Sequence, residues 1–244
     1  MLERRLAETT TIVECMRVEL KAAASASARV ETALCLLLTH APRLDASIFA
    51  SLACVSKRLA VAQPRRALVL SKAQSLALYA RRDEPHARHL LTQCVHTLDL
   101  NNTRVTDVSA LGGVHRLYLS RTRVTDVSAL GGVHTLHLFG TSVTDVSAIG
   151  GVHTLHLFGT PVTDVSALGG VHTLDLRFTS VTDVSALGGV HRLDLFRTPV
   201  TDVSALGGVH MLDLGSTRVT DVSALGGVHV LTLPDGSIRR LSSS

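Results

Sequence analysis

Histidine, aspartate and serine recur together along this chain at a fixed spacing of 19 residues. Imidazole and carboxylate groups are common metal ligands and proton carriers, and a serine, a histidine and an aspartate together form the catalytic triad of many hydrolases. The histidine column contains His96, His115, His134, His153, His172, His191, His210 and His229. The aspartate column contains Asp107, Asp126, Asp145, Asp164, Asp183, Asp202 and Asp221, each two residues before a serine. Metal binding and nucleophilic catalysis are therefore the first functions to test against the sequence.

The periodicity itself argues against these two functions. If each copy contributes one strand to a parallel sheet, neighbouring imidazoles stand about 4.8 Å apart, whereas nitrogen ligands lie about 2.0–2.1 Å from a single zinc ion. Each turn offers one carboxylate, and calcium solenoids supply several oxygen ligands per turn. A catalytic site is singular, and seven equivalent Ser-His-Asp sets leave no distinct oxyanion-binding site. We therefore predict no enzyme activity, no metal and no cofactor.

Each of the two columns has a structural interpretation instead. The histidines are predicted to form a stacked, neutral ladder that loses stability when it is protonated between pH 7.5 and 5.5, because like charges then face each other at close range. The aspartates are predicted to accept hydrogen bonds from backbone N–H groups of the following turn.

The segment that positions both columns is Val-Thr-Asp-Val-Ser-Ala-Leu-Gly-Gly-Val-His. It occurs seven times, with Ile149 as its single departure, starting at Val105, Val124, Val143, Val162, Val181, Val200 and Val219. A fixed short period is typical of a solenoid, in which each unit buries its apolar side against its neighbours. Between the copies, segments such as Leu174-Asp175-Leu176 alternate with the period of two of a strand. The spacing of three that follows suits a tight turn or one turn of 3₁₀ helix, and the Gly-Gly pair permits a corner.

This repeat, V-x-x-L-x-L-x-x-T-x-V, resembles the leucine-rich repeat, L-x-x-L-x-L-x-x-N-x-L, in its short internalin-like variety, which also reads V-T-D-V-S-x-L. One departure is a threonine column where the family usually has asparagine, and the hydroxyl groups could bond neighbouring backbone groups. The resemblance covers residues 95–233. It implies an α/β fold: a leucine-rich-repeat solenoid with a gently curved, one-strand-per-repeat parallel sheet, preceded by an α-helical N-terminal module.

Four parts of the chain are expected on this basis. They are a helical module at 1–64, an N-terminal cap of the solenoid at 65–94 with a short strand near 67–70 and a helix over 72–93 that is interrupted near Pro85, the solenoid at 95–233, and a C-terminal tail at 234–244.

The positions that vary while the scaffold stays constant are candidate protein-binding residues. Those on the strands alternate with buried leucines and point outward. Four of the five phenylalanines lie at or just past strand ends among arginines and aspartates, which is the composition of binding hot spots. The alternative is that these rings fold over the edge of the ladder and complete the core. The predicted binding residues are Arg116, Tyr118, His137, Phe139, His156, Phe158, Asp175, Arg177, Phe178, Arg192, Asp194, Phe196 and Asp213.

Composition limits the class of protein further. Aromatic residues make up 3% of the chain and tryptophan is absent, so the core must be aliphatic. The net charge of +4 comes from the first part of the chain, but its basic residues are scattered, so no nucleic-acid partner is expected. No run approaches the roughly 20 apolar residues of a membrane span. The four cysteines lack metal-type spacing and are predicted to be reduced; with no export signal at the start, they indicate a cytoplasmic or nuclear protein.

Residues 30–62 carry a second resemblance. An apolar segment at Ala33–Leu38 is followed by Leu52-Ala-Cys-Val-Ser-Lys-Arg-Leu59, which is similar to the F-box ending L-x-x-V-S-K-R-W/F. The usual Leu-Pro opening is missing, and Leu59 replaces the common aromatic. The resemblance implies that this motif docks on the acidic adaptor subunit of an SCF-type ubiquitin ligase while the repeats hold a substrate. The adaptor-binding residues would be Leu34, Leu37, Leu38, Leu52, Val55 and Leu59.

Three alternatives remain open at this point. The N-terminal helices could be an ordinary cap of the solenoid, the repeats could be an interaction module without a ligase role, or the chain could be an internalin-like surface adhesion protein. All three share the prediction of a protein partner on the strand face.

Overall fold

The computed structural model describes residues 68–69, 72–83, 88, 91 and 95–240. The chain divides into two compact units, Met1–Asp99 and Leu100–Ser244. The F-box-like segment 30–62 and the four cysteines lie outside the described residues.

The described part of the first unit contains a short parallel pair of strands and one helix. Strand β1 (Leu68–Val69) pairs with β2 (Val95–Asp99), and helix α4 (Lys72–Tyr79) lies between them in the chain. Leu78 and Leu98 are completely buried. The backbone N–H of Asp99 donates a hydrogen bond of 3.3 Å to the hydroxyl of Ser75 in α4, which fixes the helix to the strand. The strand expected near 67–70 is therefore present at Leu68–Val69, and the helix expected over 72–93 is present over Lys72–Tyr79 and gives way to a turn at 80–83.

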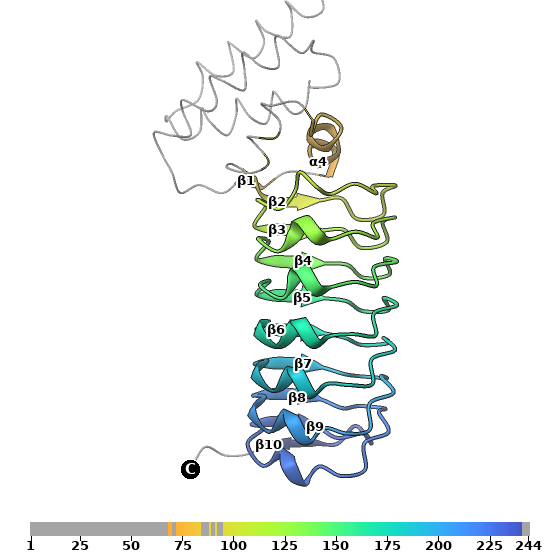
Figure 1. The fold of residues 1–244 in the computed structure, drawn as a ribbon, viewed down its shortest axis with the longest axis vertical. Helices are drawn as coiled ribbons and strands as arrows, with labels where there is room; N and C mark the ends of the chain where they lie inside the picture. Colours follow the sequence, from red (N-terminus) through yellow and green to blue (C-terminus); the bar gives the residue numbers. More distant parts are fainter. Residues whose placement is uncertain (1–67, 70–71, 84–87, 89–90, 92–94, 241–244) are drawn as a thin grey trace, which may run out of the picture. The chain divides into compact units, whose positions relative to one another are not determined.

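The second unit is a ladder of short strands, one per repeat, stacked almost straight (Figure 1). Successive strands are parallel and pair residues that lie 19 positions apart, as Leu136 does with Leu155. The strands are β3 (Arg116–Tyr118), β4 (Thr135–His137), β5 (Thr154–His156), β6 (Thr173–Asp175), β7 (Arg192–Asp194), β8 (Met211–Asp213) and β9 (Val230–Thr232). The last strand, β10 (Ile238–Arg240), is antiparallel to β9 and falls in the segment expected to be a tail.

The constant part of each repeat returns the chain to the start of the next strand. The return segments are 105–113 and the equivalent residues every 19 positions. The first contains tight turns and the other six contain a short 3₁₀ helix, which are the two forms that the apolar spacing of three predicted. The 3₁₀ helices are η2 (Ser128–Leu130), η3 (Ser147–Ile149), η4 (Ser166–Gly170), η5 (Ser185–Gly189), η6 (Ser204–Gly208) and η7 (Ser223–Leu225).

The core between strands and return segments is aliphatic, as the composition requires. Leu155 and Leu157 from β5 and the loop after it, and Val162 from the next return segment, have no exposed surface. The backbone hydrogen bonds continue past the strand ends, where the N–H of Leu157 donates to Asp175 O at 2.8 Å and that of Gly159 donates to Arg177 O at 2.9 Å. Each repeat thus satisfies the backbone polar groups of its neighbour while it covers its apolar side.

The Gly-Gly corner is required by close approach of the next repeat. A Cβ atom on Gly188 would lie 2.5 Å from the carbonyl oxygen of Ala205, and one on Gly189 would lie 3.1 Å from that of Gly169. The equivalent glycines that begin the corner have ordinary right-handed backbone angles, for example φ −59° at Gly131. Space rather than backbone freedom therefore dictates glycine here.

No helix among the described residues is long and apolar enough to cross a lipid bilayer.

Candidate functional site

The histidine column is a continuous stack of seven rings from His115 to His229. Neighbouring ring centroids lie 4.4–4.6 Å apart and the ring planes differ by 9–29°. Near-parallel rings direct their nitrogens along parallel lines, so the nitrogens do not converge on one point. Within the described part of the chain, no group of three or more His, Cys, Asp or Glu side chains is placed to hold a metal ion.

Two rings of the stack have perturbed acidities. Partial burial, and after it the neighbouring charge of His115 and Arg116, lowers the pKa of His134. Burial and the adjacent rings of His210 and His172 lower the pKa of His191. Both shifts favour neutral imidazoles, in the direction that the sequence predicted for a stacked ladder.

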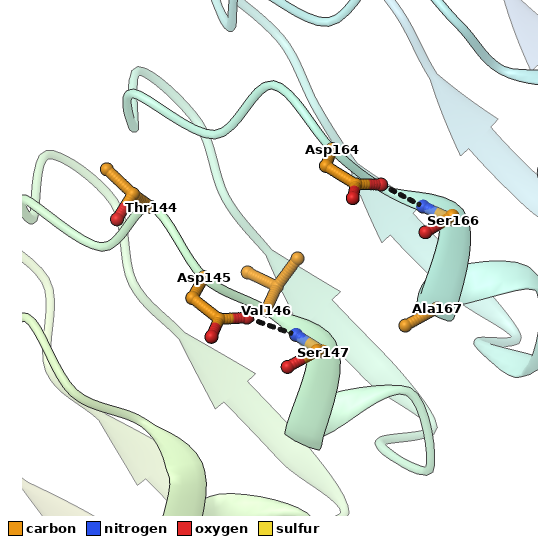
Figure 2. A pocket seen from close by; sticks show the side chains of 7 residues that line it. All are labelled: Thr144, Asp145, Val146, Ser147, Asp164, Ser166 and Ala167. Carbon is orange, nitrogen blue, oxygen red and sulfur yellow. Dashed lines mark hydrogen bonds between the residues drawn. The ribbon is translucent and has the colours of Figure 1, made fainter.

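The aspartate column caps the 3₁₀ turns. Asp145 Oδ1 accepts a hydrogen bond of 2.9 Å from the backbone N–H of Ser147, and Asp164 accepts one of the same length from Ser166 (Figure 2). These N–H groups, together with the serine hydroxyls, lower the pKa of both carboxyl groups. The capping role predicted for the column is thereby confirmed. The remaining members make the same bond: Asp107, Asp126, Asp183, Asp202 and Asp221.

A shallow depression lies between successive return segments at this point. Its walls come from two repeats, with Asp145 and Ser147 on one side and Asp164 and Ser166 on the other (Figure 2). Among the described residues, both carboxylates bond to serine N–H groups and no hydrogen bond joins either of them to a histidine of the column, as a catalytic triad would require.

The strand face begins with stacked aromatic rings and ends with carboxylates. Tyr118, His137 and His156 stack with ring centroids 4.6 and 4.2 Å apart. His156 Nδ1 then lies 3.5 Å from Asp175 Oδ2. Arg177 donates to both oxygens of the buried Asp175, at 2.9 Å from Nε and 2.7 Å from a terminal nitrogen. Burial alone would raise the pKa of Asp175, but the bonds from His156 and Arg177 outweigh it and hold this pKa well below its usual range.

Two titratable groups near Asp175 on this face, His137 and Asp194, have pKa values shifted toward their neutral forms. Burial, and after it the neighbouring His156, lowers the pKa of His137 to about 4. Burial raises the pKa of Asp194 to about 6, and the charges of Asp213 and Asp175 act in the same direction. Arg177 Nε lies 3.3 Å from Asp194, but its two bonds to Asp175 are shorter, so it offsets the Asp194 charge only in part.

A row of phenylalanine rings runs along the exit corner, by which we mean residues 120–123, 139–142, 158–161, 177–180, 196–199 and 215–218. Centroid distances are 4.7 Å from Phe139 to Phe158, 4.9 Å from Phe158 to Phe178 and 5.7 Å from Phe178 to Phe196. The rings therefore contact one another along the edge of the ladder, and they keep exposed surface, which is 43% for Phe178. Edge packing and availability for binding coexist at this row.

The backbone at the exit corner makes the same left-handed turn in each repeat. One residue per repeat has a left-handed φ of 54–62° at this corner: Asn102, Arg121, Gly140, Gly159, Phe178, Arg197 and Ser216. A left-handed φ is unfavourable for a residue as bulky as phenylalanine. A threonine follows each of these residues, and its hydroxyl donates to the leucine carbonyl three residues earlier, as from Thr160 to Leu157 at 2.7 Å. The predicted role of the threonine column is thus confirmed.

The sequence interpretation missed two residues of this corner. The guanidinium of Arg121 lies 4.9 Å from the centroid of Phe139, and that of Arg197 lies 5.3 Å from Phe178 and 5.6 Å from Phe196. The signal that could have identified them is the column that also contains Gly140 and Gly159, since glycine at a fixed repeat position marks a left-handed φ. Of the residues predicted from the sequence, those on β3–β8 lie on one strand face beside this corner, and the six adaptor-binding residues lie outside the described part.

No protein-family model and no curated protein sequence match this chain. Solved structures do. The internalin InlF from Listeria monocytogenes is 20% identical, with a TM-score of 0.52 over 64% of this chain and 54% of that one. The internalin C2 from the same organism is also 20% identical, with a TM-score of 0.46 over 65% of this chain and 91% of that one. The chain therefore spans about half the length of the InlF structure. The fold is a leucine-rich-repeat solenoid.

Proposed function

We propose that the solenoid is a scaffold that binds another protein through its strand face and exit corner. The observation that supports this most directly is where the repeats differ. The return segments carry the same residues in copy after copy, whereas the strand face and exit corner change from repeat to repeat. Uniform residues maintain the stack, and variable residues give each level of one surface its own chemistry.

The chemistry of this surface suits protein recognition. Tyrosine, phenylalanine and arginine are enriched in binding hot spots, and here they are held in fixed positions by ring stacking and by the Asp175–Arg177 pair. A surface that is already ordered loses less conformational entropy when it binds a partner.

The test compares proteins captured by the intact chain with those captured by two double variants. Phe139→Ala with Phe158→Ala alters the proposed surface, and Thr144→Ala with Thr163→Ala alters exposed positions of the return segments. We expect the first variant to lose bound proteins and the second to retain them, with both still folded by thermal unfolding. Equal capture by the two variants would contradict the proposal.

A narrower role as the substrate-recognition subunit of an SCF-type ubiquitin ligase, and hence a location inside the cell, is supported by the sequence Val55-Ser-Lys-Arg58 before the repeats. The intact chain should then bind a ligase adaptor, and Leu37→Asp with Val55→Asp should abolish that binding. An intact chain that binds no adaptor would reject this role and leave the scaffold function standing. Detection of the chain at the cell surface would favour the adhesion alternative.

A further inference from the structure

We propose that the exit corner binds an extended, acidic segment of the partner protein, which places one carboxylate on Arg121 and a second on Arg197. This inference rests on the proposed function and specifies the chemical class of the partner.

The first support is the charge of the exit corner. Its six segments contain five arginines and neither aspartate nor glutamate: Arg121, Arg123, Arg177, Arg197 and Arg218. Arg177 is neutralised by Asp175 and Asp194. Arg121 and Arg197 are exposed, and within the described residues neither makes an ion pair. The corner thus offers positive charge that the solenoid itself does not compensate, which is complementary to an acidic partner.

The second support is that both guanidinium groups are held in place by aromatic rings. The guanidinium of Arg121 lies over Phe139, and the arginine stem passes Gly140, where its Cγ would be at an ordinary contact distance of 3.6 Å from a Cβ. Arg197 lies near Phe178 and Phe196. A guanidinium held over a ring keeps its N–H edge available for bidentate contact with a carboxylate. Ordering the side chain in advance lowers the entropic cost of that contact.

The third support is the shape of the corner between the two arginines. Three levels lie between them, and the left-handed position is occupied by Gly140 and Gly159, which carry no side chain, and then by the exposed Phe178. Phe139 and Phe158 lie beside these glycines as an apolar strip. Arg121 and Arg197 are four repeats apart, which corresponds to about 19 Å at a strand spacing of about 4.8 Å. An extended peptide advances about 3.3 Å per residue, so the two acidic residues of the partner would be separated by about five small or apolar residues.

The same arrangement disfavours a nucleic acid. A polynucleotide places a phosphate charge at every step and requires a continuous basic track. Here the guanidinium groups of Arg121 and Arg197 are separated by an apolar strip, and the half-buried carboxylates of Asp194 and Asp213 lie in the adjacent column of the strand face.

The test measures fluorescence anisotropy of a labelled synthetic peptide in which two aspartates are separated by five alanine and leucine residues. The peptide is titrated with the full chain at low and high salt. We expect binding that weakens with salt, and a loss of about tenfold or more in Arg121→Gln with Arg197→Gln. The matched control is Arg123→Gln with Arg218→Gln, which removes two exposed arginines of the same corner whose guanidinium groups lie over no ring in the described structure. This control should change the affinity less than threefold.

Two further probes sharpen the outcome. A peptide with lysine in place of both aspartates should not bind, and one with two residues between the aspartates should bind more weakly. Equal affinity for the two arginine double variants would overturn the proposal, as would tighter binding of a single-stranded oligonucleotide through Arg121 and Arg197. If the peptide does not bind, but the Phe139→Ala, Phe158→Ala double variant still captures fewer proteins than the intact chain, the proposed class of partner is wrong and the scaffold function stands.

Discussion

The return segments and the strand face of the same repeats differ in how much their chemistry varies. Along the return segments every copy repeats the same bond between an aspartate and a serine N–H, and in every copy but the last the first glycine of the pair lies against a carbonyl oxygen of the next repeat. Across the sheet, the corresponding positions read Tyr118, His137, His156, Asp175, Asp194 and Asp213. The return segment of each unit therefore maintains the stack, and the strand face can vary. A uniform aliphatic core separates the two.

The largest expected effect comes from a substitution in a return segment in the interior of the array. Gly188→Ala forces a Cβ to within 2.5 Å of the Ala205 carbonyl oxygen, whereas no atom lies within 4 Å of a Cβ on Gly226 in the last copy. We expect Gly188→Ala to lower the free energy of unfolding by about 3 kcal/mol and Gly226→Ala to change it by less than about 0.5 kcal/mol, as measured by urea denaturation. Similar losses in both variants would show that the inter-repeat contact is not what requires glycine.

An intermediate effect concerns the strand face and the way its titratable groups change the stability of the chain with pH. The folded pKa of His137 is about 4, against an ordinary 6.5, so between these values only the unfolded chain binds the proton and stability falls as the pH falls. The folded pKa of Asp194 is about 6, against 3.8, so there the folded chain binds the extra proton and stability rises as the pH falls. In the intact chain the two responses largely offset each other. Asp194→Asn should therefore lose about 2 kcal/mol between pH 7 and pH 5.

The matched variant for this prediction is His137→Gln, which should lose less stability than the intact chain over the same range. The lowered pKa values of His134 and His191 act in the same direction as that of His137, so these two residues add to the acid sensitivity of all three proteins. Identical pH profiles for the intact chain, Asp194→Asn and His137→Gln would contradict the assignment of these shifts.

The smallest expected effect concerns the hydrogen bond between the threonine hydroxyl of the exit corner and the leucine carbonyl three residues earlier, which occurs in every repeat. Thr160 is buried and donates to the Leu157 carbonyl at 2.7 Å, whereas Thr163 is exposed. Replacing Thr160 by Val leaves the shape nearly unchanged but removes the donor, at a cost of about 1 kcal/mol. Thr163→Val should leave the stability nearly unchanged. Thermal unfolding of both variants measures the difference. A larger loss of stability in Thr163→Val than in Thr160→Val would mean that the Thr160 hydroxyl does not stabilise the exit corner.

The sequence alone predicts most of the solenoid because its physics is local and repeated. The alternation at Leu174 and Leu176 indicates a strand, the period of 19 residues sets the parallel register, and the position of Asp183 before Ser185 indicates a capped turn. The structure shows all three.

The exit corner is harder to predict because it depends on contacts between residues of different repeats. That Arg121 lies over Phe139, 18 residues later, requires knowing the left-handed turn at Arg121 and the position of the next repeat. The sequence likewise predicted that a side chain would clash at the Gly-Gly pair, but not that the clash at Gly188 is with the carbonyl oxygen of Ala205 in the next repeat. Neither fact is visible from a single unit.

The constant register, in which every residue meets its counterpart 19 positions on, has a consequence for how such a molecule can change over generations. A duplicated unit inserted anywhere in the array would meet the same atoms above and below it, so its junctions need no new chemistry. Residues 133–141 and 152–160 are already identical, Val-His-Thr-Leu-His-Leu-Phe-Gly-Thr in both. The array can therefore lengthen in increments of about 4.8 Å, and each added unit widens the surface on offer before its exposed residues diverge.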